Sequence, residues 1–121
     1  MGLNMAGDLE LLRGTLDVLI LKALSFGPRH GYAVAEWLET STGDLLQVGE
    51  GSLYPALHRL EERAWVRSSW GLSENNRRAR FYELTTEGRR RLKTEAAWWA
   101  RFAGTVTAVL ARSASPESRT A

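Results

Sequence analysis

Side chains that could bind phosphate groups and base edges are concentrated in the segment from residue 51 to residue 66, GSLYPALHRLEERAWV. Ser52 and Tyr54 supply hydroxyl groups, and His58 and Arg59 supply an imidazole and a guanidinium. Such donors contact the phosphates and base edges of DNA, and few acids stand among them to repel phosphate. The segment therefore predicts a surface that binds nucleic acid, provided that these side chains share one face.

The apolar residues of the same segment indicate a helix. They recur four and three residues apart and so lie on one stripe: Leu53, Leu57, Leu60 and Ala64. The polar donors then lie on the opposite side. Pro55 has no N–H and belongs near the first turn of a helix, so we expect the helix to begin between Gly49 and Gly51.

A short β-hairpin is predicted directly after this helix. Residues 65–70 form its first strand, with Val66, Ser68 and Trp70 on one face, and residues 80–84 form its second, where Phe81, Tyr82 and Leu84 favour a strand. The loop 71–79 is polar, and its tip holds four consecutive residues: Asn75, Asn76, Arg77 and Arg78. A helix with a polar outer face followed by a basic hairpin, or wing, is typical of the winged helix-turn-helix fold.

Two helices are predicted to precede the polar one and to hold it in place. The first covers residues 15–26, with Thr15 as its N-cap and Asp17 near its positive end, and the second covers residues 31–40. Val18 and Leu21 form a second apolar strip on the first helix. We therefore expect that helix to contact its own core and a further surface.

A long helix is predicted to end the fold, from Thr86 to Arg112, with Thr85 as its N-cap. Its apolar residues alternate four and three apart over nearly three heptads: Leu92, Ala96, Trp99, Ala103, Val106 and Leu110. Such a helix is roughly 40 Å long, more than a small winged domain can cover. We interpret it as a dimerisation helix; the alternative is packing only on the first helix of its own chain.

Composition indicates one domain in a reducing compartment. The chain has 121 residues, 44% of them hydrophobic, no cysteine and a net charge of +2. Residues 1–46 carry three Lys or Arg against six Asp or Glu, whereas residues 47–93 carry ten against six. The positive excess thus lies in the elements predicted to contact DNA, where it would attract phosphate.

Other classes of function find little support. The two histidines, His30 and His58, have no carboxylate or cysteine beside them in a motif. No phosphate-binding loop, metal-ligand spacing or nucleophile elbow is present, so we expect no enzyme activity, no cofactor and no metal. The apolar run 18–21 is too short to cross a membrane, and no signal peptide is visible. The alternative function is a winged helix that binds protein instead of DNA, through Trp37, Trp65 and Trp70.

Three segments at family spacing resemble the PadR-like transcriptional regulators. They are PRHGYAVAEWL (28–38), the segment GSLYPALHRLEERAWV, and WGLSENNRRARFYELTTEG (70–88), within a resemblance that covers residues 11–110. The resemblance implies a cytoplasmic bacterial repressor, homodimeric through its first and last helices, that binds an inverted-repeat operator in double-stranded DNA. It also implies release of the DNA when a small molecule or another signal arrives.

The family's DNA-contacting positions fall on nine residues of this chain: Tyr32, Ser52, Tyr54, Pro55, His58, Arg59, Asn76, Arg77 and Arg78. We expect the dimer contacts on the first and last helices, at Leu16, Val18, Leu21, Leu92, Trp99, Phe102, Val106 and Leu110. Tyr54 could instead be a half-buried core aromatic, His58 could simply be solvated, and Tyr32 could pack under its helix.

Trp98, Trp99 and Phe102 place more aromatic area on the last helix than a coiled-coil seam normally uses. Doubled across a two-fold axis, these rings could form the walls of a flat pocket for a planar, hydrophobic effector, including a cationic one. The alternative is that they only fill the dimer interface.

The chain departs from the family pattern at two turns. Ala64-Trp65 stand where a glycine usually ends the DNA-reading helix. A Cβ in the left-handed conformation costs on the order of 1 kcal/mol, so we expect a longer or differently shaped exit. Asn75-Asn76 stand where glycine is common at the wing tip, and Asn tolerates positive φ.

The expected organisation is mainly α with a small β-wing. It comprises an N-terminal arm (1–14), a winged helix-turn-helix domain (15–85), a dimerisation helix (86–112) and a disordered tail (113–121).

Overall fold

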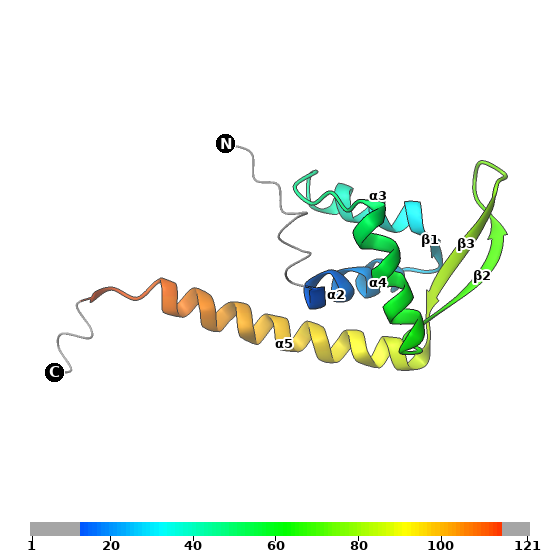
Figure 1. Ribbon diagram of the computed structural model, residues 1–121. Coiled ribbons are helices and arrows are strands. Elements are labelled where there is room, and N and C mark those ends of the chain that lie inside the picture. The colour runs from blue at the N-terminus through cyan, green and yellow to red at the C-terminus, as the bar shows by residue number, and fades with distance from the viewer. Residues whose placement is uncertain (1–12, 115–121) are drawn as a thin grey trace.

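Helices α2, α3 and α4 and a small sheet form the body of the protein in the computed structural model, which describes residues 13–114 (Figure 1). The elements follow in the order α2 (Arg13–Leu24), β1 (Arg29–His30), α3 (Gly31–Ser41), α4 (Glu50–Glu62), β2 (Val66–Leu72), β3 (Arg78–Leu84) and α5 (Thr86–Leu110). This confirms the predicted winged helix-turn-helix with a long last helix. Most of the predicted arm (1–14) and tail (113–121) lies outside the described residues.

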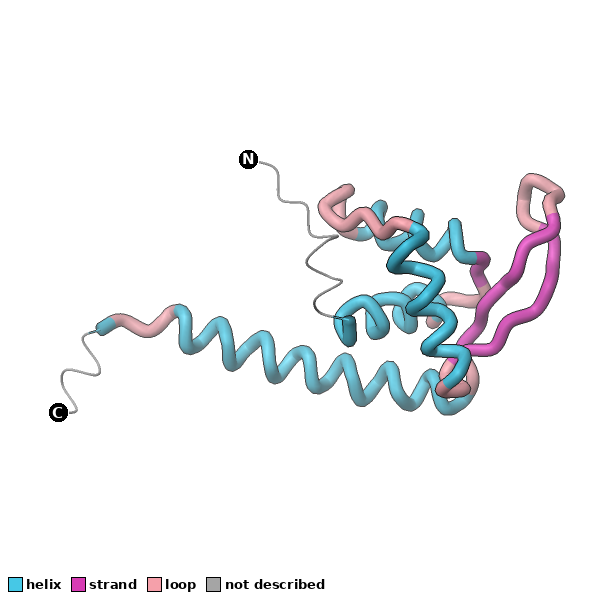
Figure 2. The backbone as a smooth tube through the Cα atoms, in the orientation of Figure 1, coloured by secondary structure: helices cyan, strands magenta, loops and turns pink. Residues whose placement is uncertain are grey.

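The sheet has the antiparallel order β1-β3-β2, and β2 and β3 extend beyond the body as the wing (Figure 2). Their register runs from Val66↔Leu84 to Leu72↔Arg78. Both strands are longer than predicted at the tip, so the loop covers residues 73–77 instead of 71–79. The two-residue strand β1 pairs with β3 and ties the start of α3 to the wing.

The structure corrects the predicted bounds of the first helix. Helix α2 already includes Arg13 and Gly14, so Thr15 lies inside the helix and does not cap it. The helix ends at Leu24, and Gly27 with φ 132° turns the chain toward β1. Asp17 was expected near the positive end of the helix, but it lies in the middle and is buried.

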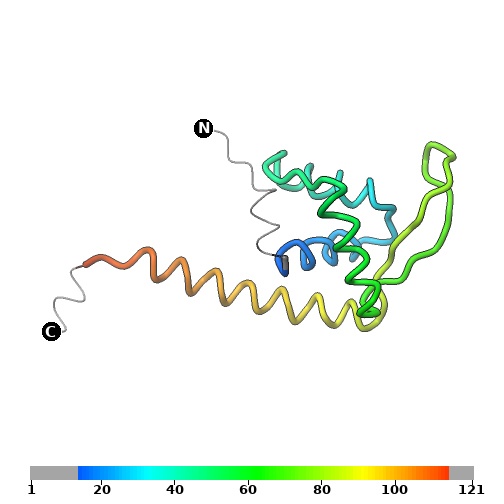
Figure 3. Tube along the Cα trace, in the orientation of Figure 1, coloured from blue at the N-terminus to red at the C-terminus, as the bar shows by residue number. Residues whose placement is uncertain are grey.

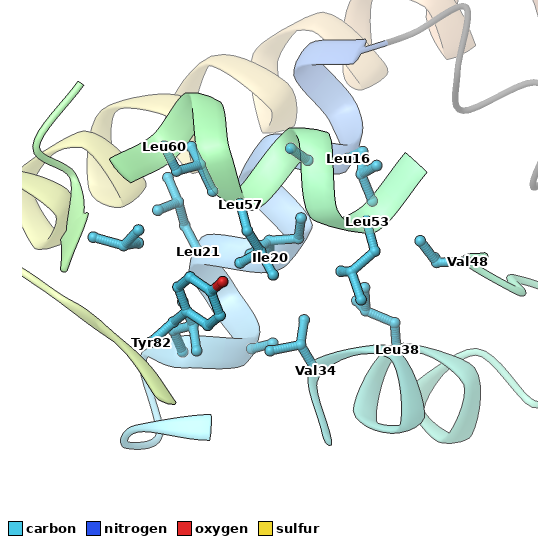
Figure 4. Close-up of a cluster of buried hydrophobic side chains, with 14 of the residues drawn as sticks. Leu16, Ile20, Leu21, Val34, Leu38, Val48, Leu53, Leu57, Leu60 and Tyr82 are labelled. Atoms are coloured by element: carbon cyan, nitrogen blue, oxygen red, sulfur yellow. The ribbon is translucent and has the colours of Figure 1, made fainter. Parts of the chain in front are cut away.

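The hydrophobic core lies where α2, α3, α4 and the base of the wing meet (Figure 4). Among its members are Ile20, Val34, Leu38, Leu53, Leu57, Leu60, Val66 and Leu84. Leu16 and Leu21 belong to the same cluster and are 3% and 1% exposed. These two side chains, which were predicted to contact a second chain, are thus enclosed by their own chain and present almost no surface to a partner.

Helix α4 ends in a tight left-handed turn, although Ala64 was expected to disfavour one. Ala64 adopts φ 62°, its N–H donates to the Glu61 carbonyl at 3.0 Å, and the Trp65 N–H donates to the Leu60 carbonyl at 3.0 Å. These two bonds form the Schellman motif that usually has glycine at this position. The prediction of a longer or differently shaped end of α4 is therefore wrong. Thr85 Oγ1 donates a hydrogen bond to the Ala64 carbonyl at 2.7 Å, and this bond helps to hold the strained turn.

Helix α5 begins as predicted and then leaves the body (Figures 1 and 3). Thr85 is its N-cap, and the Thr85 hydroxyl accepts a hydrogen bond from the Gly88 N–H at 3.0 Å. The first half of α5 contacts α2. From residue 100 onward every described residue is exposed, so the outer half of α5, residues 100–110, has no cover from the described part of its own chain.

Candidate nucleic-acid interface

Helix α4 separates its buried and outward faces as predicted. Leu53, Leu57 and Leu60 point into the core, whereas Tyr54 and His58 are exposed. Ser52, in the first turn, is half-buried. The outward face therefore offers an imidazole and a partly exposed phenol.

Helix α4 begins at Glu50 with Gly49 as its N-cap, within the predicted interval. Pro55 nevertheless lies in the second turn, not the first. Its ring cannot donate to the carbonyl of Gly51, but that glycine is exposed, so water can take the place of the missing donor.

Tyr54 links α4 to the first turn of α3. A Cβ added to Gly31 would lie 2.6 Å from the Tyr54 hydroxyl oxygen, so only glycine allows the phenol to lie this close. Tyr54 is 43% exposed, which leaves part of its ring accessible. Tyr32 follows Gly31 and is largely exposed rather than packed under its helix. The structure thus places two predicted DNA-contacting tyrosines at the same helix start.

His30 was not among the predicted site residues, yet it joins α3 to the wing. Its Nδ1 accepts a hydrogen bond from the Ala33 N–H at 3.2 Å and caps α3, and its Nε2 lies 3.3 Å from Glu74 Oε1. A hydrogen bond from its own backbone N–H, followed by that from His30, lowers the pKa of the Glu74 carboxyl. A histidine directly before a predicted helix is the signal that could have indicated this cap.

The tip of the wing presents the predicted basic loop to solvent. Asn76, Arg77 and Arg78 are all exposed. Asn76 has φ 59°, as its tolerance of positive φ allowed, and its N–H donates to the Ser73 carbonyl at 2.8 Å. Because Glu74 of the same loop contacts His30, the wing tip, the start of α3 and Tyr54 of α4 form one continuous run of contacts.

Arg59 differs from the other predicted DNA-contacting residues. Its guanidinium turns inward and donates to Asp17 Oδ1 at 2.8 Å, and Arg63 lies 3.7 Å from Asp17 Oδ2. The guanidinium that was predicted to contact phosphate thus forms an ion pair that fastens α4 to α2. Asp17 is the residue that sequence reasoning missed, because its partner is 42 positions away.

A second junction connects the end of α4 to α5. The Trp65 ring contacts two guanidiniums, with Arg63 Cζ 5.1 Å and Arg91 Cζ 4.8 Å from its centre. Arg91 in turn pairs with Glu95 at 2.8 Å. Packing and charge therefore run without a break from Asp17 on α2, through the exit of α4, to the first half of α5.

The three predicted pocket residues of α5 form one aromatic cluster. Trp98 and Phe102 stack with ring centres 4.9 Å apart, and Trp99 contacts both rings edge-on. A cavity of about 560 Å³ adjoins them and is also lined by Gly14, Thr15, Arg91, Thr94 and Glu95. Its wall thus combines aromatic rings with the carboxylate and guanidinium of the Arg91–Glu95 pair.

Apart from the buried Leu16 and Leu21, the predicted dimer contacts fall into two groups. Val18, Leu92 and Trp99 line a separate apolar groove of about 400 Å³ between α2 and α5, together with Thr15, Leu19, Lys22 and Ala96. Phe102, Val106 and Leu110 are exposed on α5. The apolar seam of α5 is thus partly covered by α2 in the first half of the helix and is exposed in its outer half.

Comparison with known proteins gives one consistent result. The model of the transcriptional regulator PadR-like family matches residues 20–94. A PadR-like transcriptional regulator from Bacillus cereus has a similar structure, with a TM-score of 0.74 and 25% sequence identity over 86% of this chain and 99% of that one. A PadR family transcriptional regulator from Eggerthella lenta gives a TM-score of 0.73 and 31% identity over 87% of this chain and 89% of that one.

A much longer relative contains a segment similar to this chain. An uncharacterized 37.1 kDa protein from a transposon in Streptomyces fradiae is 45% identical over 90 residues, which are 74% of this chain but 24% of that protein. The similarity to that relative therefore concerns one segment of it. Within residues 13–114, no helix combines the length and the hydrophobicity that crossing a membrane requires.

Proposed function

The chain belongs to the PadR-like family of transcriptional regulators, and from this premise we propose that it is a homodimeric repressor that binds an inverted-repeat operator. The observation that carries the proposal is the run of contacts joining Tyr54, the start of α3 and the basic wing tip. This run holds a helix for base readout and a cationic hairpin for phosphate contact in one fixed arrangement. A repressor of this kind acts on the chromosome, in the cytoplasm.

Base readout falls to the exposed face of α4. Tyr54 and His58 offer hydrogen-bonding groups that can reach base edges in the major groove. Arg77 and Arg78 supply positive charge at the wing, which suits phosphate or minor-groove contact. With Arg59 engaged by Asp17, the cations of the interface lie mainly on the wing.

The outer half of α5 supports the homodimer. Phe102, Val106 and Leu110 leave an apolar strip in water that a second copy of α5 would cover. Two subunits related by a two-fold axis bind two half-sites about one turn of DNA apart, which accounts for an inverted-repeat operator.

The aromatic cluster of Trp98, Trp99 and Phe102 is the proposed effector site. A planar, hydrophobic compound can stack on the Trp98 and Phe102 rings, and the Glu95 carboxylate at the cavity wall favours one with positive charge. Arg91 and Glu95 also belong to the junction with Trp65 and α4. A ligand that shifts this pair would change the position of α4 and lower the affinity for the operator.

Gel shift of the DNA immediately upstream of the gene tests the proposed function. We expect the wild-type protein to retain a fragment with an inverted repeat and to lose it steeply as salt rises. Arg77→Ala with Arg78→Ala should weaken binding to all sequences alike, whereas Tyr54→Ala or His58→Ala should cost roughly 1–3 kcal/mol on the operator alone. Identical behaviour of the two kinds of variant would contradict the division into positioning and reading residues.

Calorimetry with a panel of planar dyes tests the effector site separately. Trp98→Ala should lose binding, and Val109→Ala, an exposed position of α5 outside the cavity, should keep it. If no dye binds the wild type, or if Trp98→Ala binds as tightly, the aromatic cluster only fills the dimer interface.

A protein-binding module is the second candidate function. The three tryptophans named as its anchors, Trp37, Trp65 and Trp70, differ in how far they are engaged within the chain. Trp37 packs on Phe26 with ring centres 5.6 Å apart, and Trp65 is held by Arg63 and Arg91. Only Trp70, which is 57% exposed, is available for a partner among the three tryptophans named for this role.

A further inference from the structure

Trp70 lies on the face of the wing that turns toward α4. Val66, Ser68 and Trp70 alternate along β2, and their cross-strand partners on β3 are Leu84, Tyr82 and Arg80. Directly opposed residues share a face of a sheet. Near the base this face is buried as part of the core, and Glu61 of α4 contacts both Ser68 Oγ at 2.6 Å and Arg80 at 3.5 Å.

Beyond the core, the same face carries two arginines stacked on one indole ring. Arg78 Cζ lies 4.6 Å and Arg80 Cζ 5.6 Å from the centre of the Trp70 ring. The two arginines are two residues apart on β3, or about 6.6 Å along the strand. Stacking uses the flat face of a guanidinium and leaves its N–H edge available for a phosphate oxygen.

The charges around Trp70 favour a polyanion. The acids of the wing are engaged elsewhere: Glu74 contacts His30, and Glu83 pairs with Arg67 on the opposite face at 3.5 Å. Glu61 is the acid that meets Arg80, and it lies at the base of the wing, where it also accepts from Ser68. Both arginines are exposed, and the carboxylate that contacts one of them, Glu61, approaches Arg80 from the base of the wing.

We propose that Trp70, Arg78 and Arg80 form a phosphate-binding site on this face of the wing, in which the indole holds both guanidiniums ready for the sugar-phosphate backbone of the bound DNA. The site rests on the proposed DNA-binding function and extends it beyond the loop tip, down β3 toward α4. It gives Trp70 a positioning role, since the ring orders two flexible cations before DNA arrives and so reduces the entropy lost on binding.

Salt-dependent binding to a labelled duplex of about three helical turns tests the site, with affinities measured by fluorescence anisotropy between about 50 and 200 mM salt. Arg80→Gln should lower the salt slope by about 0.9 for each phosphate contact that is lost. Arg67→Gln is the matched control, because it removes the same charge from the other face of the wing and should leave the slope unchanged.

Substitution of Trp70 separates its positioning role from charge. Trp70→Leu keeps both arginines and should weaken binding about three- to tenfold, whereas Trp70→Phe keeps a ring for the cations and should restore most of that loss. Since Trp70 is exposed, the melting temperature should stay the same in both variants, which shows that the fold is intact.

Any of three results would overturn the site while leaving the proposed function standing. In the first, Arg80→Gln and Arg67→Gln have the same salt slope. In the second, Trp70→Leu binds like the wild type, and in the third, Trp70→Phe is as weak as Trp70→Leu. A wild-type protein that binds no duplex even at low salt would instead contradict the proposed function itself, and would favour a protein partner for this face.

Discussion

The body of the protein, residues 13–85, and the outer half of α5 follow the same kind of apolar pattern and end in opposite situations. In the body, Ile20, Leu57 and Leu60 are 0% exposed, because four elements of one chain surround them. On the outer half of α5, Leu110 is 79% exposed. A periodic pattern shows that a helix has an apolar face, but what covers that face depends on what else is within reach.

This difference in burial implies that the body determines the stability of each chain and that the outer half of α5 determines its assembly into a dimer. Substitutions in the body should change the free energy of unfolding of each chain directly, whereas substitutions on the outer half of α5 should act through the association of two chains. The predictions below test that division, from the largest expected effect to the smallest.

Val106→Asp with Leu110→Asp should separate the proposed dimer. Each apolar side chain that becomes fully buried contributes about 1.5–3 kcal/mol, so two per subunit should weaken association at least about a hundredfold. Light scattering should give twice the chain mass of 13.5 kDa for the wild type and the single mass for the variant.

Ala97→Asp with Ala108→Asp is the control for charge on this helix. Both alanines are exposed and lie about half a turn from the seam, so this variant should remain a dimer. A wild-type protein with the mass of one chain would contradict the interpretation of α5 as a dimerisation helix.

Asp17→Asn should have the next largest effect, on the body alone. It removes the buried charge that pairs with Arg59 at 2.8 Å, and we expect a loss of about 2 kcal/mol in urea unfolding with no change in oligomeric mass. Glu83→Gln breaks the exposed pair with Arg67 and should cost less than about 0.5 kcal/mol. Equal losses would mean that the Asp17 pair is no more than a surface contact.

Ala64→Gly should stabilise the body by about 1 kcal/mol, because glycine adopts the left-handed conformation without a clash between its side chain and the backbone. The gain should appear as a higher urea midpoint at unchanged slope. A destabilised variant would show that the entropy lost by glycine on folding exceeds the strain that it relieves.

The smallest effect concerns pH and the contact between Glu74 and His30. The pKa of Glu74 is lowered in the folded protein, so its charged form favours folding at pH values above its ordinary value of 4.5. That contribution is lost as pH falls through the lowered folded pKa. The melting temperatures of wild type and Glu74→Gln should therefore differ slightly near neutral pH and converge in acid; a difference that grows in acid would contradict this sign.

Local signals predicted most of the fold. The start of α4 was predicted between Gly49 and Gly51 from the position of Pro55, and Thr85 was predicted as the N-cap of α5. Asn75-Asn76 were expected to tolerate positive φ, and Asn76 adopts it; each of these signals is read from a few neighbouring residues. The exit of α4 was predicted wrongly because local preference disfavours Ala64 there. Contacts with the distant Thr85 outweigh that preference.

The sequence could not reveal which partners distant residues find. Arg59 was assigned to DNA because it is a cation on a polar helix, but the fold places Asp17 of α2 beside it. Leu16 and Leu21 were assigned to the dimer because α2 is apolar on two sides, but both side chains pack in the chain's own core, whereas Val18 of the second side lines the groove between α2 and α5. In the same way, only the register of β2 and β3 places Arg78 and Arg80 on Trp70.

Selection from a library of random DNA duplexes is the most direct test of the central claim, that two copies of this chain bind one operator through α4 and the wing. The account predicts that the wild-type protein enriches an inverted repeat with half-sites about 10 bp apart, and that Val106→Asp with Leu110→Asp enriches none. Enrichment of a single unrepeated site by both proteins, or of no common sequence by the wild type, would contradict it.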